Sequence, residues 1–188
     1  MSAELDGSNA LVRSYVWGQD ISGTLQGAGG IGGLLTVAEV GSSYQVGHDG
    51  NGNVVAMVKA DTGKAAASYE YDAFGNTLKA TGEYAQRNPF QFSTKYTDKE
   101  TNLVYFGYRY YLPQLGRWLG RDPSHEEGGL HLYAYVQNNP ISFTDPFGLW
   151  ATDAHNEILD QAFKNCLSAA QLQKLNDASA YVAPKSVC

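Results

Sequence analysis

A short turn motif recurs along this chain of 188 residues and constrains its fold more than any other feature. Asp49-x-x-Gly52-Asn53 and Asp72-x-x-Gly75-Asn76 match each other 23 residues apart, and a fainter copy begins at Asp98. In such a turn the aspartate hydrogen-bonds the backbone that follows it, while glycine and asparagine accept left-handed conformations. Alternating apolar and polar residues flank the turns, which predicts one β-hairpin per copy. A single hairpin cannot bury its own apolar face, so the hairpins are expected to stack into a longer sheet.

The composition also favours strands. The chain contains 21 glycines and 13 tyrosines, and only 17% of its residues are charged, against about 25% in average globular proteins. We expect strands at 11–17, 44–48, 54–58 and 67–71. The predicted fold is therefore mainly β, with antiparallel hairpins that form a curled sheet and a small α-helical tail after residue 149.

Several classes of function are disfavoured. The net charge of −6 and the lack of any Lys/Arg run argue against a nucleic-acid partner. Acids near the N-terminus do not fit a signal peptide, and glycines and polar residues within 21–40 make a membrane span unfavourable. Cys166 and Cys188 have no metal-site or disulfide spacing, so no metal or cofactor is expected.

Three further stretches leave alternatives open. The glycine-rich run 27–35 suggests a phosphate loop, but it lacks the Gly-Lys-Ser/Thr ending, so close packing against another strand is favoured. The Asp/Asn/Gly turns suggest calcium, but no distal Glu or helical flanks are present, which favours structural turns. In the aromatic band 105–111, alternation predicts Tyr105, Arg109 and Tyr111 on one face, with packing favoured over stacking against sugars.

Two Asp-Pro pairs, Asp122-Pro123 and Asp145-Pro146, bracket a strand-like run at 128–136. Proline fixes its own φ and holds the preceding residue in an extended conformation, so both aspartates are expected on stiff corners. Taken alone, each pair is an ordinary turn corner.

The chain resembles the C-terminal core of the RHS/YD-repeat proteins in an ordered series of motifs over residues 11–149. The series comprises Tyr71-Asp72-Ala73-Phe74-Gly75-Asn76, Asn88-Pro89-Phe90-Gln91-Phe92, Tyr108-Arg109-Tyr110-Tyr111-Leu112-Pro113, Leu115-Gly116-Arg117-Trp118, Arg121-Asp122-Pro123 and Asp145-Pro146-Phe147-Gly148-Leu149. Single motifs such as Asp-Pro are common, whereas this order and spacing is specific.

The resemblance implies a hollow shell of spiralling β-sheet, closed by a conserved core around a variable C-terminal region that is often a toxin. It assigns residues 1–104 to YD-repeat hairpins, 105–149 to the core and 150–188 to the variable tail, either a truncated effector or a remnant. The implied partners are an upstream shell, the chain's own C-terminal region and an immunity protein for a full-length toxin. The implied location is secreted or at the cell surface.

The resemblance also implies an intramolecular aspartyl protease. Asp122 and Asp145 would be its acid pair and Arg121 a supporting charge, and the cut would fall between Leu149 and Trp150. Neighbouring carboxylates can share a proton, so that together they activate water and protonate the leaving nitrogen. The alternative is a non-cleaving structural or adhesive module that binds carbohydrate through its tyrosines.

Some residues depart from the family pattern or fall outside it. His131 stands where the family usually has Asn, and Ser124-His125 replaces an apolar residue. A metal site from His125, Glu126, Glu127 and His131 has no diagnostic spacing, so a solvated loop is favoured. In the tail, helical spacing after Asp153 and a capping box at 168–171 predict two short helices without an assigned activity.

Overall fold

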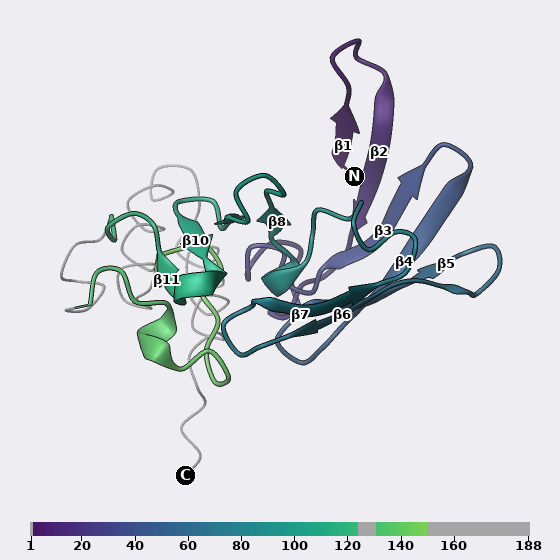
Figure 1. The fold of residues 1–188 in the computed structure, drawn as a ribbon. Coiled ribbons are helices and arrows are strands. Elements are labelled where there is room, and N and C mark those ends of the chain that lie inside the picture. Colours follow the sequence, from purple (N-terminus) through teal and green to yellow (C-terminus); the bar gives the residue numbers. More distant parts are fainter. Residues whose placement is uncertain (1, 124–130, 150–188) are drawn as a thin grey trace.

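The computed structural model describes residues 2–123 and 131–149, and most of the regular structure in these residues is β-strand (Figure 1). Seven antiparallel strands form one sheet in chain order: β1 (Ser2–Leu5), β2 (Leu11–Trp17), β3 (Leu34–Glu39), β4 (Ser42–His48), β5 (Val54–Lys59), β6 (Ala65–Tyr71) and β7 (Thr77–Thr81). This meander confirms the predicted mainly β fold of antiparallel hairpins. The helices predicted for the tail lie outside the described residues.

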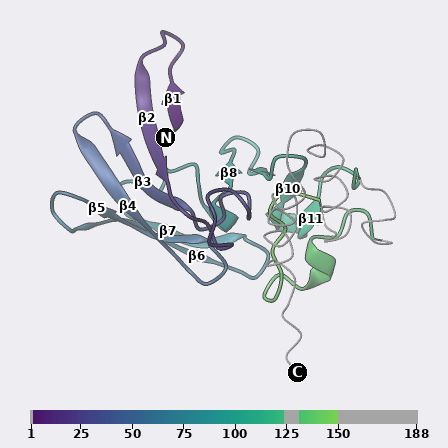
Figure 2. The ribbon, with the colours of Figure 1, turned by 180° about the vertical axis from the view of Figure 1, so that it is seen from behind.

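A smaller antiparallel sheet follows, with strand order β11-β10-β9-β8. Its strands are β8 (Tyr96–Thr97), β9 (Val104–Tyr105), β10 (Tyr110–Leu112) and β11 (Arg117–Trp118), and the 3-10 turns nearby are η1 (Phe92–Thr94), η2 (Pro113–Leu115) and η4 (Val136–Asn138). Figure 2 shows from behind that the long strands fan out with a strong twist and that the small sheet lies beside one end of them. The division of the chain at residue 105 stays a prediction.

The repeated turns have the same hydrogen bonds. Asp49 Oδ1 accepts from the backbone N–H of Asn51 and Asn53, both at 2.9 Å, and its Oδ2 accepts from Asn53 Nδ2 at 2.8 Å. The turn at Asp72 repeats this arrangement with Phe74 and Asn76. The motif is thus a structural turn that joins β4 to β5 and β6 to β7.

One local prediction was wrong. The described part of the run 128–136, from His131 onward, is a turn with one isolated bridge between Arg117 and Ala134, because η4 takes left-handed φ values at residues 136–138. The glycine-rich run 27–33 is not a strand itself, but it lies close to β2: the N–H of Gly18 donates to Gly33 O at 2.8 Å, and a Cβ atom added at Gly30 would lie 3.2 Å from the Trp17 ring. The run folds as successive turns around the buried carboxylate of Asp20, whose Oδ2 accepts from the N–H groups of Ala28 and Gly30.

Each sheet has its own core. Residues of β2 to β6 and Tyr84 form the first cluster, and the second is mostly aromatic, with Phe92, Phe106, Tyr111, Trp118 and Tyr135 at its centre. The Tyr71 side chain packs against both clusters, and its hydroxyl donates to Val54 O at 2.8 Å. The aromatic cluster therefore anchors the small sheet to the hairpin sheet and supports the acids described next.

Candidate active site

Asp145 lies at the start of a tight turn and is fully buried. Its Oδ1 accepts hydrogen bonds from the backbone N–H groups of Phe147 (3.2 Å), Gly148 (2.8 Å) and Leu149 (3.0 Å). Three donors converging on one oxygen hold a carboxylate in a single orientation and fit its negative charge. Leu149, the residue before the predicted cut, is therefore attached directly to one of the predicted acids.

Asp122 follows β11, and only 4% of its surface is exposed. Its backbone N–H donates to Leu132 O at 3.0 Å, which ties the first Asp-Pro corner to the segment that leads to the second. The tertiary structure thus brings together two aspartates that are 23 residues apart in the sequence.

Arg109 joins the two aspartates. Its Nη2 lies 2.8 Å from Asp122 Oδ2 and 3.6 Å from Asp145 Oδ2, and all three side chains are at most 4% exposed. The two carboxylate oxygens therefore flank a single nitrogen. A guanidinium suits this place because it stays charged and donates in a planar fork.

The rest of the Arg109 side chain is also held. Its Nε donates to Gly148 O, its Nη1 donates to Leu132 O at 3.3 Å, and the guanidinium lies over the Trp118 ring, 4.3 Å from the centroid. Burial lowers the pKa of Arg109 from its usual value, and the charges of Asp145 and Asp122 oppose this shift. An arginine keeps its charge under such a shift, so it can balance one of the two carboxylates.

Sequence reasoning assigned the supporting charge to Arg121, which is exposed in the structure. The ion pairs of the described residues join Arg109, not Arg121, to the acids. The catalytic roles of Asp122, Asp145 and Arg121 stay predictions, as does the cut after Leu149, and Trp150 lies outside the described residues.

The alternation predicted for the aromatic band was wrong, and Arg109 was not among the predicted site residues. Phe106, Arg109 and Tyr111 are buried, while Tyr105, Tyr108 and Tyr110 are exposed. The chain turns between β9 and β10, where the N–H of Phe106 donates to Arg109 O. The alternation of buried and exposed side chains along β9 therefore does not continue in step into β10. An arginine amid aromatic residues was the only signal that the sequence offered.

The exposed tyrosines are aligned across the small sheet. Tyr105 pairs in register with Tyr96 on β8 and Tyr110 on β10, and all three are between 45% and 48% exposed. The rings of Tyr105 and Tyr110 lie 5.1 Å apart. Stacking against a sugar on this row stays a prediction.

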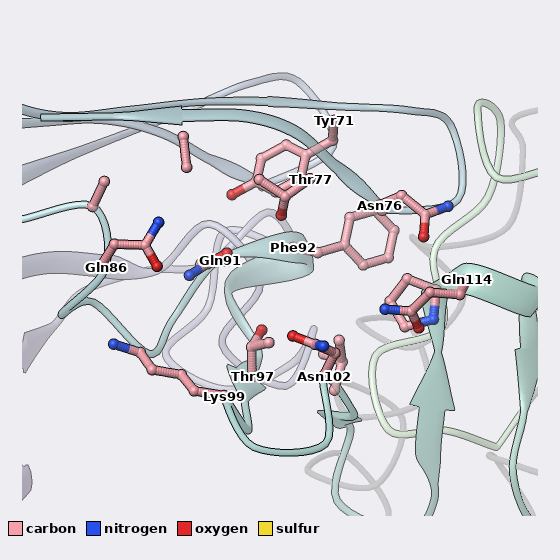
Figure 3. Close-up of a pocket in the computed structure, with 15 residues that line it drawn as sticks. Tyr71, Asn76, Thr77, Gln86, Gln91, Phe92, Thr97, Lys99, Asn102 and Gln114 are labelled. Carbon is pink, nitrogen blue, oxygen red and sulfur yellow. The ribbon is translucent and has the colours of Figure 1, made fainter.

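A hollow of about 430 Å³ lies away from the acid pair, between β6–β7 and the small sheet (Figure 3). Five amide side chains line it together with Tyr71 and Phe92: Asn76, Gln86, Gln91, Asn102 and Gln114. Asp122, Asp145 and Arg109 do not line this hollow.

Lys95 is a second buried cation near the turn. Its Nζ donates to Pro146 O at 2.6 Å and to Gly29 O at 2.7 Å. Burial lowers the pKa of Lys95 to about 8, and the nearby charges of Asp145 and Asp20 oppose this shift.

The lowered pKa of Lys95 predicts a rise in stability at alkaline pH. Between the folded pKa of about 8 and the unfolded value of 10.5 the unfolded chain binds more protons, so raising the pH favours the folded state. Lys95 should contribute about 2 kcal/mol to the free energy of unfolding between pH 7 and 9.5, measured by urea denaturation as the difference from Lys95→Met, because the buried tyrosines with raised pKa values act in the opposite direction in both chains. The variant Lys95→Met should lack this contribution, and an equal change with pH in both chains would contradict the assignment.

Metal and membrane features are absent from the described residues. Within 2–123 and 131–149 no three His, Cys, Asp or Glu side chains gather closely enough to hold a metal ion. No helix in the described part of the chain is long and apolar enough to cross a membrane. His131 is exposed, whereas Ser124, His125, Glu126 and Glu127 lie outside the described residues.

The fold and the acid pair define a class of protein, in which a sheet of β-hairpins is followed by a core that contains a buried acidic turn, here residues 145–149. The chain matches the family model of the Teneurin YD-shell over residues 29–141, more than half its length, and it belongs to this family. This match, together with the relatives below, confirms the resemblance to the RHS/YD-repeat proteins.

The chain is similar to parts of much longer proteins. The tRNA nuclease WapA of Bacillus subtilis is 34% identical over 152 residues, which cover 78% of this chain and 6% of WapA. Toxin subunit YenC2 of Yersinia entomophaga is 38% identical over 111 residues, which cover 56% of this chain and 10% of YenC2. The crystal structure of TcdB2-TccC3 without its hypervariable C-terminal region matches with a TM-score of 0.54 and 33% identity, over 57% of this chain and 5% of that one.

Proposed function

We propose that this chain closes a YD shell of a toxin-related protein and cuts its own backbone between Leu149 and Trp150. Asp122 and Asp145 are the acid pair, and the cut separates the shell from a variable C-terminal region. The matched TcdB2-TccC3 has a hypervariable C-terminal region, which supports a boundary of this kind. Secretion, or display at the cell surface, belongs to the same proposal, as does an immunity protein for a full-length toxin.

One observation carries the proposal: the predicted acids share a buried arginine, and one of them binds the residue before the cut. Asp122 and Asp145 both lie within 3.6 Å of Arg109 Nη2, and the N–H of Leu149 donates to Asp145 Oδ1 at 3.0 Å. Because catalyst and substrate belong to one chain, the reaction is unimolecular and positioning takes the place of substrate binding.

The reaction we propose is a single hydrolysis. The ionised carboxylate of the pair takes a proton from water as the water oxygen attacks the carbonyl carbon of Leu149. The C–N bond to Trp150 then breaks, and a proton from the pair passes to the leaving nitrogen. The products are a new carboxyl group on Leu149 and a new amine on Trp150, and the pair regains its starting protonation. Arg109 balances one negative charge throughout.

Replacing either acid by its amide should abolish the cut. Asp122→Asn and Asp145→Asn preserve size but remove the group that accepts or delivers the proton, so each chain should remain a single species of 20.4 kDa. Intact-mass measurement during refolding follows the reaction directly. The unmodified chain should give two fragments, one ending at Leu149 and the other beginning at Trp150.

Asp61→Asn is the matched control, since Asp61 is exposed in the turn between β5 and β6. It should cut like the unmodified chain. Cutting that survives in Asp122→Asn or Asp145→Asn would remove that residue from the mechanism. An unmodified chain that folds and stays intact would support the second candidate, a non-cleaving structural or adhesive module, for which the exposed tyrosine row is the specific observation.

A further inference from the structure

The glycine-rich run 27–33 has no role in the hairpin repeat, yet it is tightly built. Asp20 is 6% exposed, and its Oδ2 accepts from Ala28 N–H at 2.7 Å and from Gly30 N–H at 3.1 Å. Ala28 and Ile31 are fully buried. The run is therefore a fixed piece of structure, held around one carboxylate.

This run contacts the acidic turn directly at Gly29. A Cβ atom added there would lie 2.5 Å from Pro146 O, 2.8 Å from Lys95 Nζ and 3.2 Å from the Phe147 ring, and φ at Gly29 is +58°. No side chain fits at this position, because the first contact is a backbone atom and the conformation is left-handed. Glycine is thus required for the run to close onto the turn.

Lys95 links the run 27–33 to the acidic turn through hydrogen bonds. It is 7% exposed, its Nζ donates to the carbonyls of both Gly29 and Pro146, and the ammonium lies 5.5 Å from the centre of the Phe106 ring. The partners are 66 and 51 residues away in the sequence. A buried ammonium needs such acceptors, so the two carbonyls fix where it lies.

Both the carbonyl and the N–H groups of the acidic turn are hydrogen-bonded. The carbonyls of Pro146, Phe147 and Gly148 accept from Lys95, from the N–H of Tyr108 and from Arg109. The N–H groups of residues 147–149 donate to Asp145. Lys95 is the one contact in this set that comes from outside the core segment 105–149.

We infer that Lys95 is a positioning residue for the cleavage segment, and that the run 27–33 is a strap that Lys95 ties over it. This inference rests on the proposed self-cleavage. The strap comes from the hairpin sheet, between β2 and β3, so it makes the geometry of the acidic turn depend on a folded shell. Lys95 acts through the Pro146 carbonyl and does not touch the reacting bond.

The first test is the rate of self-cleavage, measured by intact mass, in Lys95→Met and in the matched control Lys99→Met, whose lysine is exposed. Lys95→Met should cut at least about 10-fold more slowly, because small misplacements of reacting groups are costly. Lys95→Gln, which keeps an N–H donor, should recover part of the rate. Equal rates for Lys95→Met and Lys99→Met would overturn the inference.

The second test does not depend on cleavage. Amide hydrogen exchange is measured by NMR in chains that carry Asp122→Asn, with and without Lys95→Met. The amides of Phe147, Gly148 and Leu149 should exchange at least about 10-fold faster in Lys95→Met, while those of Lys59 and Gly63, which are hydrogen-bonded in the turn between β5 and β6, should not change. Unchanged exchange at residues 147–149 would overturn the inference.

The two tests separate the inference from the proposed function. If the unmodified chain is never cut, self-cleavage fails, and the exchange measurement alone decides whether Lys95 holds the turn. If Lys95→Met raises exchange throughout the chain, Lys95→Gln and Gly29→Ala replace it in the same measurement. Faster exchange confined to residues 147–149 in those variants supports the strap, and its absence overturns it.

Discussion

Replacing Arg109 by methionine should destabilise the chain by about 3–5 kcal/mol, the usual cost of removing one partner from a buried ion pair. The change leaves buried carboxylate charge without the guanidinium that balances it, and it also removes the hydrogen bonds to Gly148 O and Leu132 O. Urea unfolding, followed by tryptophan fluorescence, measures the loss. Both chains should carry Asp122→Asn, so that cleavage does not interfere. The carboxylate that loses its partner in this comparison is then that of Asp145, which lies 3.6 Å from Arg109 Nη2.

With both aspartates present, Arg109→Met should also slow self-cleavage by about 100-fold or more, since the Leu149 turn loses its fixed position. Arg109→Lys keeps the charge but not the planar fork, so it should restore stability only in part. Arg121→Gln alters an exposed side chain and should change the free energy of unfolding by less than about 0.5 kcal/mol. If Arg121→Gln stops the cut and Arg109→Met does not, the supporting charge is Arg121.

Gly82→Ala should destabilise the hairpin sheet by about 3 kcal/mol or more. Gly82 follows β7 with φ at +103°, and a Cβ atom there would lie 2.3 Å from Ala66 O and 2.9 Å from Ala67 Cα. The backbone must shift to admit it, which strains the Tyr84 N–H hydrogen bond to Ala66 O. An unfavourable left-handed conformation costs about 1–2 kcal/mol, and overpacking adds about 1–3 kcal/mol.

Gly63→Ala is the matched control for this prediction. Gly63 also has a positive φ, +68°, but nothing lies within 4 Å of an added Cβ. It should cost only the conformational part, about 1–2 kcal/mol. Both variants are compared by urea unfolding in the Asp122→Asn chain, and equal losses at the two positions would show that the contact with Ala66 does not matter.

Local chemistry explains which parts of the fold were predictable. The turns at Asp49 and Asp72 depend on a carboxylate that binds N–H groups two and four residues ahead, so the whole interaction lies within one short motif. The run after His131 was mispredicted as a strand because apolar residues such as Val136 adopt left-handed φ values there. Val136 is fully buried in the aromatic cluster, a contact that no short motif encodes.

The sequence by itself determined the hairpin repeat, the family resemblance and the two aspartates on proline corners, because these depend on neighbouring residues and on the order of motifs. Only the tertiary structure decided which basic side chains lie beside Asp122, Asp145 and the turn that follows Asp145. The turn at residues 106–109 reverses strand parity and buries Arg109, and Lys95 meets carbonyls 51 and 66 residues away. Contacts over such distances arise from how the two sheets and the strap pack together, so no local pattern in the chain could specify them.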